Sequence, residues 1–343
     1  MAVNSNWLLV TALLTTVYRF ITSVTDISII VVNYNTKEHL LKCIASASQQ
    51  GKDVNCRVIV VDNGSSDGSL EAVRQQYLEV IIIRNEQNQG FARAVNQGLK
   101  TADNCDYHLI LNSDARLADD YLKKAIGFLE THPGCAMVTG QLLNPDGSRQ
   151  NSFDNFPSLW SETFGKGLLR IISPRKYPSK KQSYTEPIEV ESVIGAAMLV
   201  RQKAIEDIGL LDEDYFFFLE ETDWCYRMKQ KGWSIYFVPE ALAYHLQGET
   251  KKLVLIPAKI EYLKSLYTFF RKRDSIPVYW LLRLIKPLKI ILGLAANLLL
   301  SLLTLGLVKS FRQDLILYAS LAVWHIRFCT EKMTLRGMSS PRA

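Results

Sequence analysis

The chain has 343 residues, enough for one large domain and an appendage, and its hydrophobic fraction of 48% is ordinary for a globular protein. Its net charge is +6, and the excess is concentrated near the C-terminus. The six cysteines form no CxxC pair and have no metal-ligand spacing, which favours free buried thiols in a reducing compartment over disulfides or a cysteine metal site.

The first 25 residues form an apolar N-terminal segment that contains the run WLLVTALLTTVYRFITSV. It lacks a basic region before the run and a small-residue cleavage site after it, so it is a poor signal peptide. We expect an amphipathic helix that lies on a membrane or on the domain. A translation start placed too early is the alternative interpretation.

Four buried strands alternate with helical patterns in the next part of the chain. The strands are DISIIVVNYN, CRVIVVDN, VIIIRN and YHLILNSDARL, and helices are expected over 38–50, from about Ser69, and over 91–100. This alternation predicts an α/β fold with a mostly parallel sheet, in which ligands bind outside the carboxyl ends of the strands. The polar residues Asn33, Asp62, Asn112 and Asp114 lie at those ends.

The pattern changes after residue 120. A helix to His132 is followed by a strand and a Pro-Asp-Gly turn, and residues 151–187 resemble a flexible loop because they are basic and rich in Ser and Pro. The stretch 190–205 predicts a strand that leads into a helix. GWSIYFVPEALAYHLQG predicts a strand, a proline turn and a second strand.

The C-terminal part combines a basic stretch with an apolar one. No charge occurs between Ile290 and Val308, about the length of a membrane span. A spanning or re-entrant helix, an in-plane monotopic helix and a buried core helix all remain open. The apolar neighbours argue against DNA binding by the preceding basic residues, which are Lys251, Lys252, Lys259, Lys264, Arg271, Lys272, Arg273, Arg283, Lys286 and Lys289.

The turns after the strands narrow the chemistry. No Gly-x-Gly-x-x-Gly motif and no P-loop lysine follows the first strand, which argues against a dinucleotide cofactor and ATP hydrolysis. Asp62 can accept hydrogen bonds from a base or ribose, or it can serve only a turn. Asp114 can bind Mg²⁺ or Mn²⁺ that also holds a diphosphate, or it can form an Asx turn.

The stretch FFFLEETDWCYR, residues 216–227, places acids beside apolar residues. If Glu220 and Glu221 begin a helix, its dipole stabilises their charge, and Asp223 lies roughly on the same face as Glu220. A carboxylate in a partly apolar pocket is suited to act as a general base. The alternative is that these acids form a solvated cluster that only caps the N-terminus of this helix. His245, which ends a later strand, is either a core residue or a metal ligand that would favour Mn²⁺ over Mg²⁺.

Together these motifs have a familiar order. Residues 26–250 resemble the family-2 glycosyltransferases, most closely their rhamnosyltransferase-like branch of bacterial polysaccharide assembly, through VVNYN, VDNGSSDGS, NQGFARAVNQG, LNSDARL, VIGAAMLVR, FFFLEETDWCYR and AYH. The resemblance implies a GT-A fold, a nucleotide-diphosphate sugar donor, a divalent cation and inversion at the anomeric carbon.

The resemblance also implies roles at the donor site. Asp62 corresponds to the ligand of the nucleotide base, and Asn33 and Tyr34 to the wall around ribose and base. The loop and helix start that shape the donor site correspond to Asn88, Gly90 and Asn96.

For the metal and the reaction, Asp114 corresponds to the last acid of the Asp-x-Asp motif and His245 to the third metal-site residue. Asn112 stands at the first acidic place, which leaves one carboxylate fewer for the metal. The family brings donor sugar and acceptor together at a site that corresponds to Gly195 and Ala196. The family's catalytic base is usually the second acid of a Glu-Asp pair, so Glu221 is expected here, with Asp223 in reserve.

The resemblance gives the tail a function as well. Residues 251–343 are expected to be a helical membrane-associating region that holds the active site at the cytoplasmic leaflet of the inner membrane. The acceptor is then a polyprenyl-diphosphate-linked saccharide. Rhamnose from a dTDP donor is the first expectation, with other hexoses from UDP or GDP donors open. Because there is no Gln-x-x-Arg-Trp motif, one sugar is expected per encounter.

Two other classes compete with this interpretation. A non-catalytic sugar-nucleotide-binding scaffold protein would have lost some of the acids, yet Asp62, Asp114 and the Glu220–Glu221 pair are present. A nucleotidyltransferase needs a glycine-rich loop with Lys or Arg after the first strand, and NYNTKEH is not such a loop.

Overall fold

The structure is a computed structural model that describes residues 25–50, 54–102, 104–174, 177–178, 182–246 and 255–336. The predicted N-terminal helix over residues 1–25 lies almost entirely outside the described residues, as do Lys251 and Lys252.

The first half of the α/β part follows the predicted alternation of strands and helices. Its four strands pair in parallel, in the order β3-β2-β1-β4. Their bounds, with those of the connecting helices, are β1 (Asp26–Asn33), α2 (Lys37–Ser48), β2 (Asn55–Asp62), α3 (Ser69–Gln76), β3 (Ile81–Arg84), α4 (Phe91–Thr101) and β4 (Tyr107–Asn112).

The second half makes the sheet mixed. The strand order continues as β10-β6-β11-β5, with β10 antiparallel to both β4 and β6. The elements are β5 (Ala115–Leu117), α5 (Tyr121–Thr131), β6 (Cys135–Leu143), β8 (Ile188–Glu189), β10 (Ala197–Arg201), α8 (Gln202–Ile208), α9 (Glu220–Gln230) and β11 (Ser234–His245).

Two predicted strands differ in detail. The run 107–117 divides into β4 and β5, because the chain turns at residues 113–114 and β5 pairs antiparallel with β11 at the far edge of the sheet. The predicted strand, proline turn and strand form the single strand β11. Pro239 is accommodated by a register irregularity between Val238 and Leu242, where no regular ladder bond is needed.

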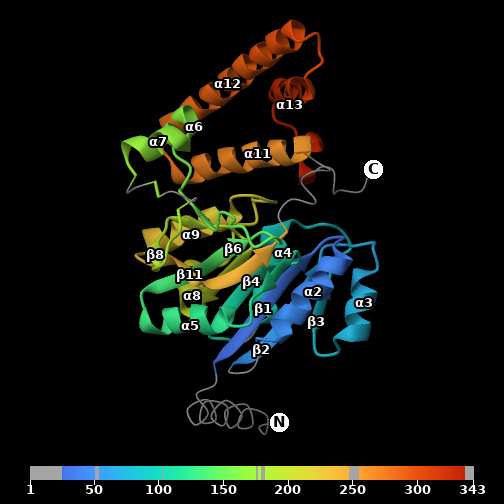
Figure 1. Cartoon of the computed structure of the whole chain (residues 1–343), viewed down its shortest axis with the longest axis vertical. Coiled ribbons are helices and arrows are strands. Elements are labelled where there is room, and N and C mark those ends of the chain that lie inside the picture. Colours follow the sequence, from blue (N-terminus) through green and yellow to red (C-terminus); the bar gives the residue numbers. More distant parts are fainter. Residues whose placement is uncertain are drawn as a thin grey trace, which may run out of the picture.

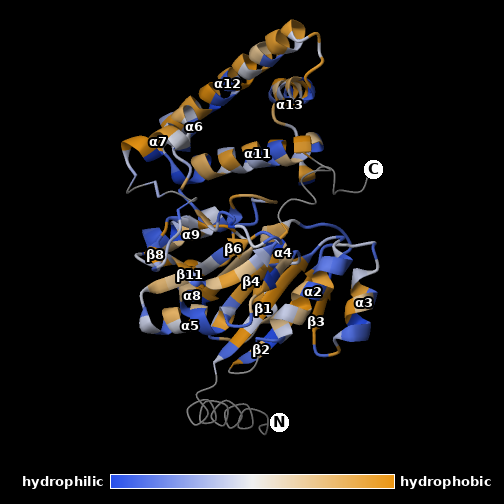
Figure 2. Ribbon diagram, in the orientation of Figure 1, coloured by the Kyte–Doolittle hydropathy of each residue, from blue (hydrophilic) through white to orange (hydrophobic). Residues whose placement is uncertain are grey.

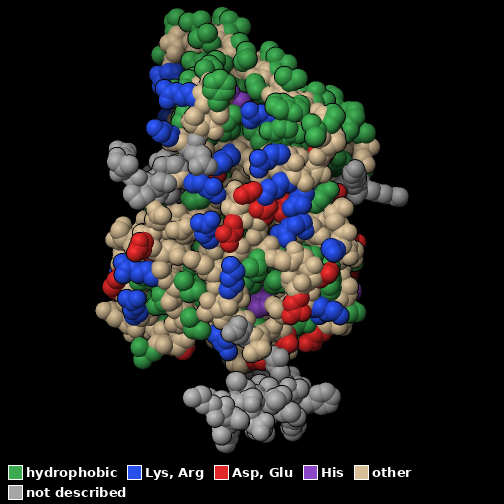
Figure 3. All heavy atoms as spheres, turned by 180° about the vertical axis from the view of Figure 1, so that it is seen from behind, with side chains coloured by type: hydrophobic (Ala, Val, Ile, Leu, Met, Phe, Trp, Pro, Cys, Tyr) green, Lys and Arg blue, Asp and Glu red, His purple; other side chains and the backbone are tan. Residues whose placement is uncertain are grey.

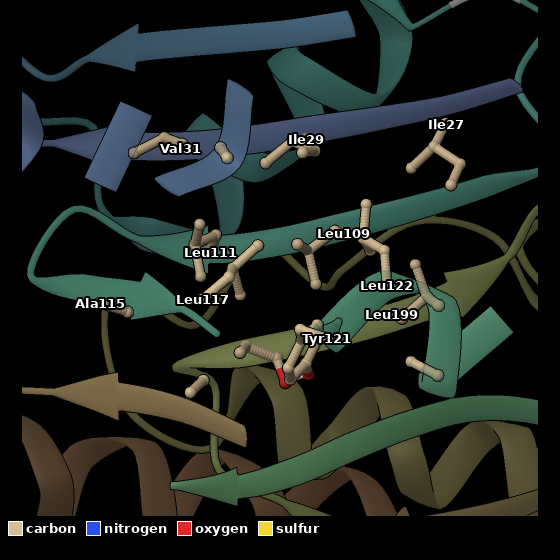
Figure 4. Close-up of a cluster of buried hydrophobic side chains, with 14 of the residues drawn as sticks. Ile27, Ile29, Val31, Leu109, Leu111, Ala115, Leu117, Tyr121, Leu122 and Leu199 are labelled. Carbon is tan, nitrogen blue, oxygen red and sulfur yellow. Dashed lines mark hydrogen bonds between the residues drawn. The ribbon is translucent and has the colours of Figure 1, made fainter. Parts of the chain in front are cut away.

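The sheet lies between two helical layers (Figure 1). Alternate residues of β1 divide between the faces: Ile27, Ile29 and Val31 pack with α2 and α5, whereas Ile30 packs with α4 and α9. Figure 4 shows the first of these clusters, in which the Tyr121 hydroxyl donates a hydrogen bond to the carbonyl of Ala197. The clusters fix the register of the strands and so the position of their carboxyl ends.

The segment 151–187 was expected to be a flexible loop, and this expectation is wrong for its described part. The segment forms β7 (Phe153–Asp154), α6 (Leu159–Phe164) and α7 (Lys166–Ile172), and β7 pairs with β9 (Ser192–Val193). A capping box between Ser158 and Ser161 begins α6, and an ion pair of 2.6 Å joins Lys166 to Asp154. Local hydrogen bonding therefore orders a stretch whose composition suggests a loop.

Helices follow at the carboxyl edge of the parallel strands (Figure 1). They are α11 (Leu255–Arg273), α12 (Ile276–Leu303), α13 (Lys309–Ile326) and the short 3-10 helix η1 (Glu331–Met333). The uncharged run that begins at Ile290 is the second half of α12, and the first half carries Arg283, Lys286 and Lys289. By length and composition α12 is the one helix, among the described residues, that is suited to cross a membrane.

Candidate active site

A hydrogen-bond network joins the ends of β1, β2 and β4. The buried Asn33 amide donates to Asp62 Oδ1 at 2.7 Å and to Ser65 Oγ at 3.0 Å, and the Ser65 backbone N–H donates to Asp62 Oδ2 at 2.9 Å. The Thr36 hydroxyl donates to Asn33 Oδ1 and accepts from the Ser113 hydroxyl, each at 2.7 Å. The network holds Asp62 rigidly, while its carboxylate keeps lone pairs for one further donor.

Asp114 and His245 meet at the next strand ends. The pairing of β5 with β11 sets Ala115 opposite His245, which brings His245 Nε2 to 3.3 Å from Asp114 Oδ1. Gln150 orients the imidazole: its Nε2 donates to the His245 and Asn144 oxygens, which leaves its Oε1 to accept from His245 Nδ1 at 3.2 Å. His245 Nε2 is then the ring nitrogen that faces Asp114, the arrangement seen in histidines that bind metals.

Gly195 and Ala196 connect this corner to the acids of α9. The Ala196 carbonyl accepts a hydrogen bond of 2.9 Å from the Asn112 N–H, so the chain at 195–196 lies directly against the end of β4. A Cβ at Gly195 would lie 3.8 Å from Glu221 Cγ and 3.9 Å from its Cδ. The predicted donor, metal and base residues are therefore gathered at one edge of the sheet.

The two acids at the start of α9 differ in burial. Glu220 is 4% exposed, whereas Glu221 is half-buried. Burial, followed by the charges of Glu221 and Glu261, raises the pKa of Glu220 well above the usual carboxyl range. The protonated form of Glu220 is therefore favoured, and the helix dipole favours the remaining negative charge of the pair.

An unusual backbone turn aims these acids. Phe218 and Leu219, immediately before Glu220, have φ angles of 71° and 66°, in the left-handed region that costs a residue with a side chain about 1–3 kcal/mol. Gly90 supports the turn from the other side. Its φ is 87°, and a Cβ there would lie 2.6 Å from the Phe216 carbonyl oxygen, so only glycine fits.

Helix α11 packs on the same turn. Tyr215 and Leu219 belong to an apolar cluster with α11 and α13, and the Phe218 and Tyr262 rings meet edge to face at 6.0 Å. Ser265 Oγ donates a hydrogen bond of 2.9 Å to the Phe217 carbonyl. The C-terminal helices thus form part of the wall of the site.

Asp223 is held by arginines. Its fully buried carboxylate accepts hydrogen bonds from Arg227 at 2.9 Å, from Arg273 of α11 at 2.6 Å and from the Tyr215 hydroxyl at 3.2 Å. Both oxygens are occupied by cationic donors, so the geometry makes Asp223 an anchor between α9 and α11. This placement does not favour the reserve role of Asp223 as a base.

Of the remaining predicted residues, Tyr34 and Asn88 lie at the site, whereas Asn96 supports it from behind. Tyr34 is 40% exposed beside the strand-end network, and Asn88 Oδ1 accepts a hydrogen bond of 2.9 Å from the Gly90 N–H. The Asn96 amide is buried and bonded to both backbone polar groups of Leu211 and to Glu213, so Asn96 braces the loop that leads to the three phenylalanines.

Gln150, Ser265 and Arg273 are contributors that sequence reasoning missed. Gln150 lies 95 residues before His245, and Ser265 and Arg273 belong to a region read for its charge and hydropathy alone. No local sequence pattern predicts any of these contacts.

Arg273→Gln should lower the free energy of unfolding by about 1.5–3 kcal/mol, because it leaves a buried carboxylate short of a charged donor. Arg271→Gln is the matched control, since its pair with Asp214 is about 60% exposed on both sides, and its effect should stay within about 0.5 kcal/mol. Chemical denaturation of both variants measures this difference. Equal stability of the two variants would contradict the anchor role.

Glu220→Gln tests the raised pKa of Glu220. As pH rises above 4.5, the ordinary value, the unfolded chain releases this proton while the folded chain retains it, so Glu220 lowers stability with rising pH. The variant removes this effect. Its stability relative to the parent protein should increase by about 1 kcal/mol or more between pH 5 and pH 8. A pH-independent difference in thermal midpoint would refute the assignment.

Comparison with known proteins identifies the family of the chain. The family model for glycosyl transferase family 2 matches residues 28–209. N-acetylglucosaminyl-diphospho-decaprenol L-rhamnosyltransferase of Mycobacterium tuberculosis is 26% identical, over 74% of this chain and 88% of its own. The dTDP-rhamnosyl transferase RfbF of Shigella flexneri is 22% identical, over 73% and 78%.

Among solved structures, the mannosyltransferase PcManGT of Pyrobaculum calidifontis, in complex with GDP-Man and Mn²⁺, is similar with a TM-score of 0.53 and 17% identity, over 88% of this chain and 86% of its own. This likeness bears on the fold alone and confirms the predicted GT-A architecture. The chain is thus similar to two rhamnosyltransferases, and since the family model covers more than half of the sequence, it belongs to glycosyltransferase family 2.

Proposed function

We propose that this glycosyltransferase moves a sugar, with rhamnose favoured, from a nucleoside-diphosphate donor to a polyprenyl-diphosphate-linked saccharide, with inversion at the anomeric carbon. The observation that carries the proposal is the convergence at one sheet edge of the Asn33–Asp62 pair, the Asp114–His245 pair and Glu221 beside Gly195. These are the parts that donor binding, diphosphate binding and proton removal require.

The Asp114–His245 pair suits a divalent cation. It offers one carboxylate oxygen and one oriented imidazole nitrogen, and no group of three or more His, Cys, Asp or Glu side chains suited to a metal occurs in the described part of the chain. Mg²⁺ and Mn²⁺ sites in such enzymes use few protein ligands because substrate phosphates complete the coordination. When bound, the ion would neutralise the charge of the leaving diphosphate.

Glu221 is the proposed base. An acceptor hydroxyl oxygen forms its bond to the anomeric carbon while the bond to the nucleoside diphosphate breaks, and Glu221 takes the hydroxyl proton. Glu220, which favours its protonated form, keeps the pair at one negative charge and so preserves an ionised acceptor at Glu221. Asp62 and Asn33, with Tyr34 beside them, would hold the nucleoside.

The names of the relatives support the finer assignments. One relative is named for a diphospho-decaprenol acceptor and both are named for rhamnosyl transfer, which favours rhamnose over other hexoses and a lipid-linked acceptor over a soluble one. Such an acceptor cannot leave the bilayer, so we place the enzyme at the cytoplasmic face of the inner membrane, as a participant in cell-surface polysaccharide synthesis.

A thermal-shift panel tests the donor assignment. Detergent-purified protein is heated with dTDP-rhamnose, UDP-glucose, UDP-galactose, UDP-N-acetylglucosamine or GDP-mannose, each with Mn²⁺, Mg²⁺ or EDTA. A donor at about 100 times its Kd adds roughly 2.7 kcal/mol to the folded state, so dTDP-rhamnose with metal should raise the midpoint clearly. A shift with another donor would refute rhamnose, and no shift in folded protein would count against the transferase function.

Glu221→Gln should lower kcat about 10²- to 10⁴-fold, because it removes the proton acceptor, and should leave donor-induced stabilisation intact. Glu220→Gln makes the same chemical change one residue away and should cost far less, since glutamine resembles the protonated acid. Glu71→Gln, exposed on α3, serves as the neutral control. Near-normal turnover by Glu221→Gln would transfer the base to another residue.

A further inference from the structure

Helices α6, α7, α12 and α13 expose a large apolar face. Its main members include Trp160 and Phe164 of α6 and Trp280, Leu284, Leu288 and Leu299 of α12, each at least half exposed. Hydrophobic side chains cover the upper part of the molecule in Figure 3, and Figure 2 shows α12 hydrophobic along most of its length. The surface of a soluble monomeric protein rarely carries so large a continuous apolar patch.

The apolar face is one rigid surface, because α6 is fastened to α12. Lys286 forms an ion pair with Glu162, and Lys289 donates hydrogen bonds of 2.8 and 2.7 Å to the carbonyls of Glu162 and Thr163. The cations of α12 are thus engaged with the protein, which leaves the exposed side of the helix uncharged from Leu284 to Leu303, Lys289 apart.

Charge indicates what covers this face. Residues 276–336 contain eight lysines and arginines and two acidic residues, a net charge of +6 that equals the net charge of the whole chain. Lys309, Arg312 and Arg327 are exposed beside the apolar residues, and Figure 3 shows Lys and Arg side chains next to the hydrophobic ones. An apolar surface edged by cations complements a bilayer with anionic headgroups.

The same contacts oppose a transmembrane crossing. Beyond Lys289, which is tied to α6, α12 has 14 residues to Leu303, about 21 Å of helix against a hydrocarbon core of about 30 Å. Helix α13 would have to enter with α12, because a Cβ at Gly293 would lie 2.5 Å from the Tyr318 ring. That would carry Arg312 and Asp314 into the membrane, at several kcal/mol in total.

We infer that the apolar face docks in the plane of an anionic bilayer and enters one leaflet without crossing it. The inference deepens the proposed function, on which it rests for the choice of leaflet: α11 joins the docked helices to the turn before Glu220, so docking would set the acids at a fixed height above the lipid-linked acceptor.

Vesicle flotation of the full-length protein tests docking. The protein should float with phosphatidylcholine vesicles that contain phosphatidylglycerol, and more weakly with phosphatidylcholine alone. The double variant Leu284→Glu, Leu288→Glu should reduce the floated fraction by about tenfold or more. Leu78→Glu is the matched control, since Leu78 is 90% exposed on the catalytic part. Equal flotation of the double variant and the control would overturn the proposal, as would a soluble dimer that Leu284→Glu dissociates.

Sided labelling distinguishes in-plane docking from crossing. Glu71→Cys and Lys309→Cys are expressed in a bacterial host and treated with a membrane-impermeant maleimide, with the parent protein giving the labelling of native thiols. In-plane docking predicts that both cysteines react in inverted membrane vesicles. Reaction of Lys309→Cys only from the periplasmic side would overturn it. Neither assay needs a donor, so a failed donor panel with intact flotation would remove the proposed function and leave the docking.

Discussion

The left-handed turn at Phe218 and Leu219 is the constraint around which the site is built. The left-handed conformation costs two bulky residues free energy. They retain this conformation only because the surrounding structure prevents any other. Gly90 contacts the turn from the loop before α4, and α11 packs on it from the C-terminal helices. The turn is therefore the point at which the sheet, the loop before α4 and the helical region hold one another in place.

The three acids that follow the turn carry the same chemical group but differ in their surroundings. Glu220 is enclosed and favours its neutral form, Glu221 faces the glycine that adjoins β4, and Asp223 is clamped by two guanidinium groups. Three carboxyl groups within four residues thus occupy three distinct environments. The phenylalanines before them contribute by shape, since Phe216 fits against Gly90 and Phe218 against Tyr262.

Much of this could be predicted from the sequence, and the limits have physical causes. The runs around Ile29, Val60 and Leu109 are long and apolar, so the parallel strands and their polar ends could be placed from hydrophobic pattern alone. The pattern could not give the antiparallel direction of β10 or the pairing of β5 with β11, because both depend on which distant strand lies beside them. Order in the described part of residues 151–187 arises from capping and an ion pair, which cannot be inferred from composition. Glu220, Glu221 and Asp223 look equivalent in the sequence. Only their burial, and the contact of Asp223 with Arg273 of another helix, distinguish them.

Helix α11 touches the turn before the acids through Ser265 and Tyr262 and reaches Asp223 through Arg273. Truncation before residue 255 would remove α11 together with the exposed apolar residues of α12. Without α11, Tyr215 and Leu219 would be exposed and the strained turn would lose its support. The shortened chain would therefore lose the geometry of its acids together with its exposed apolar surface. Solubility is better sought by exchanging exposed leucines of α12 for polar residues while the scaffold stays whole.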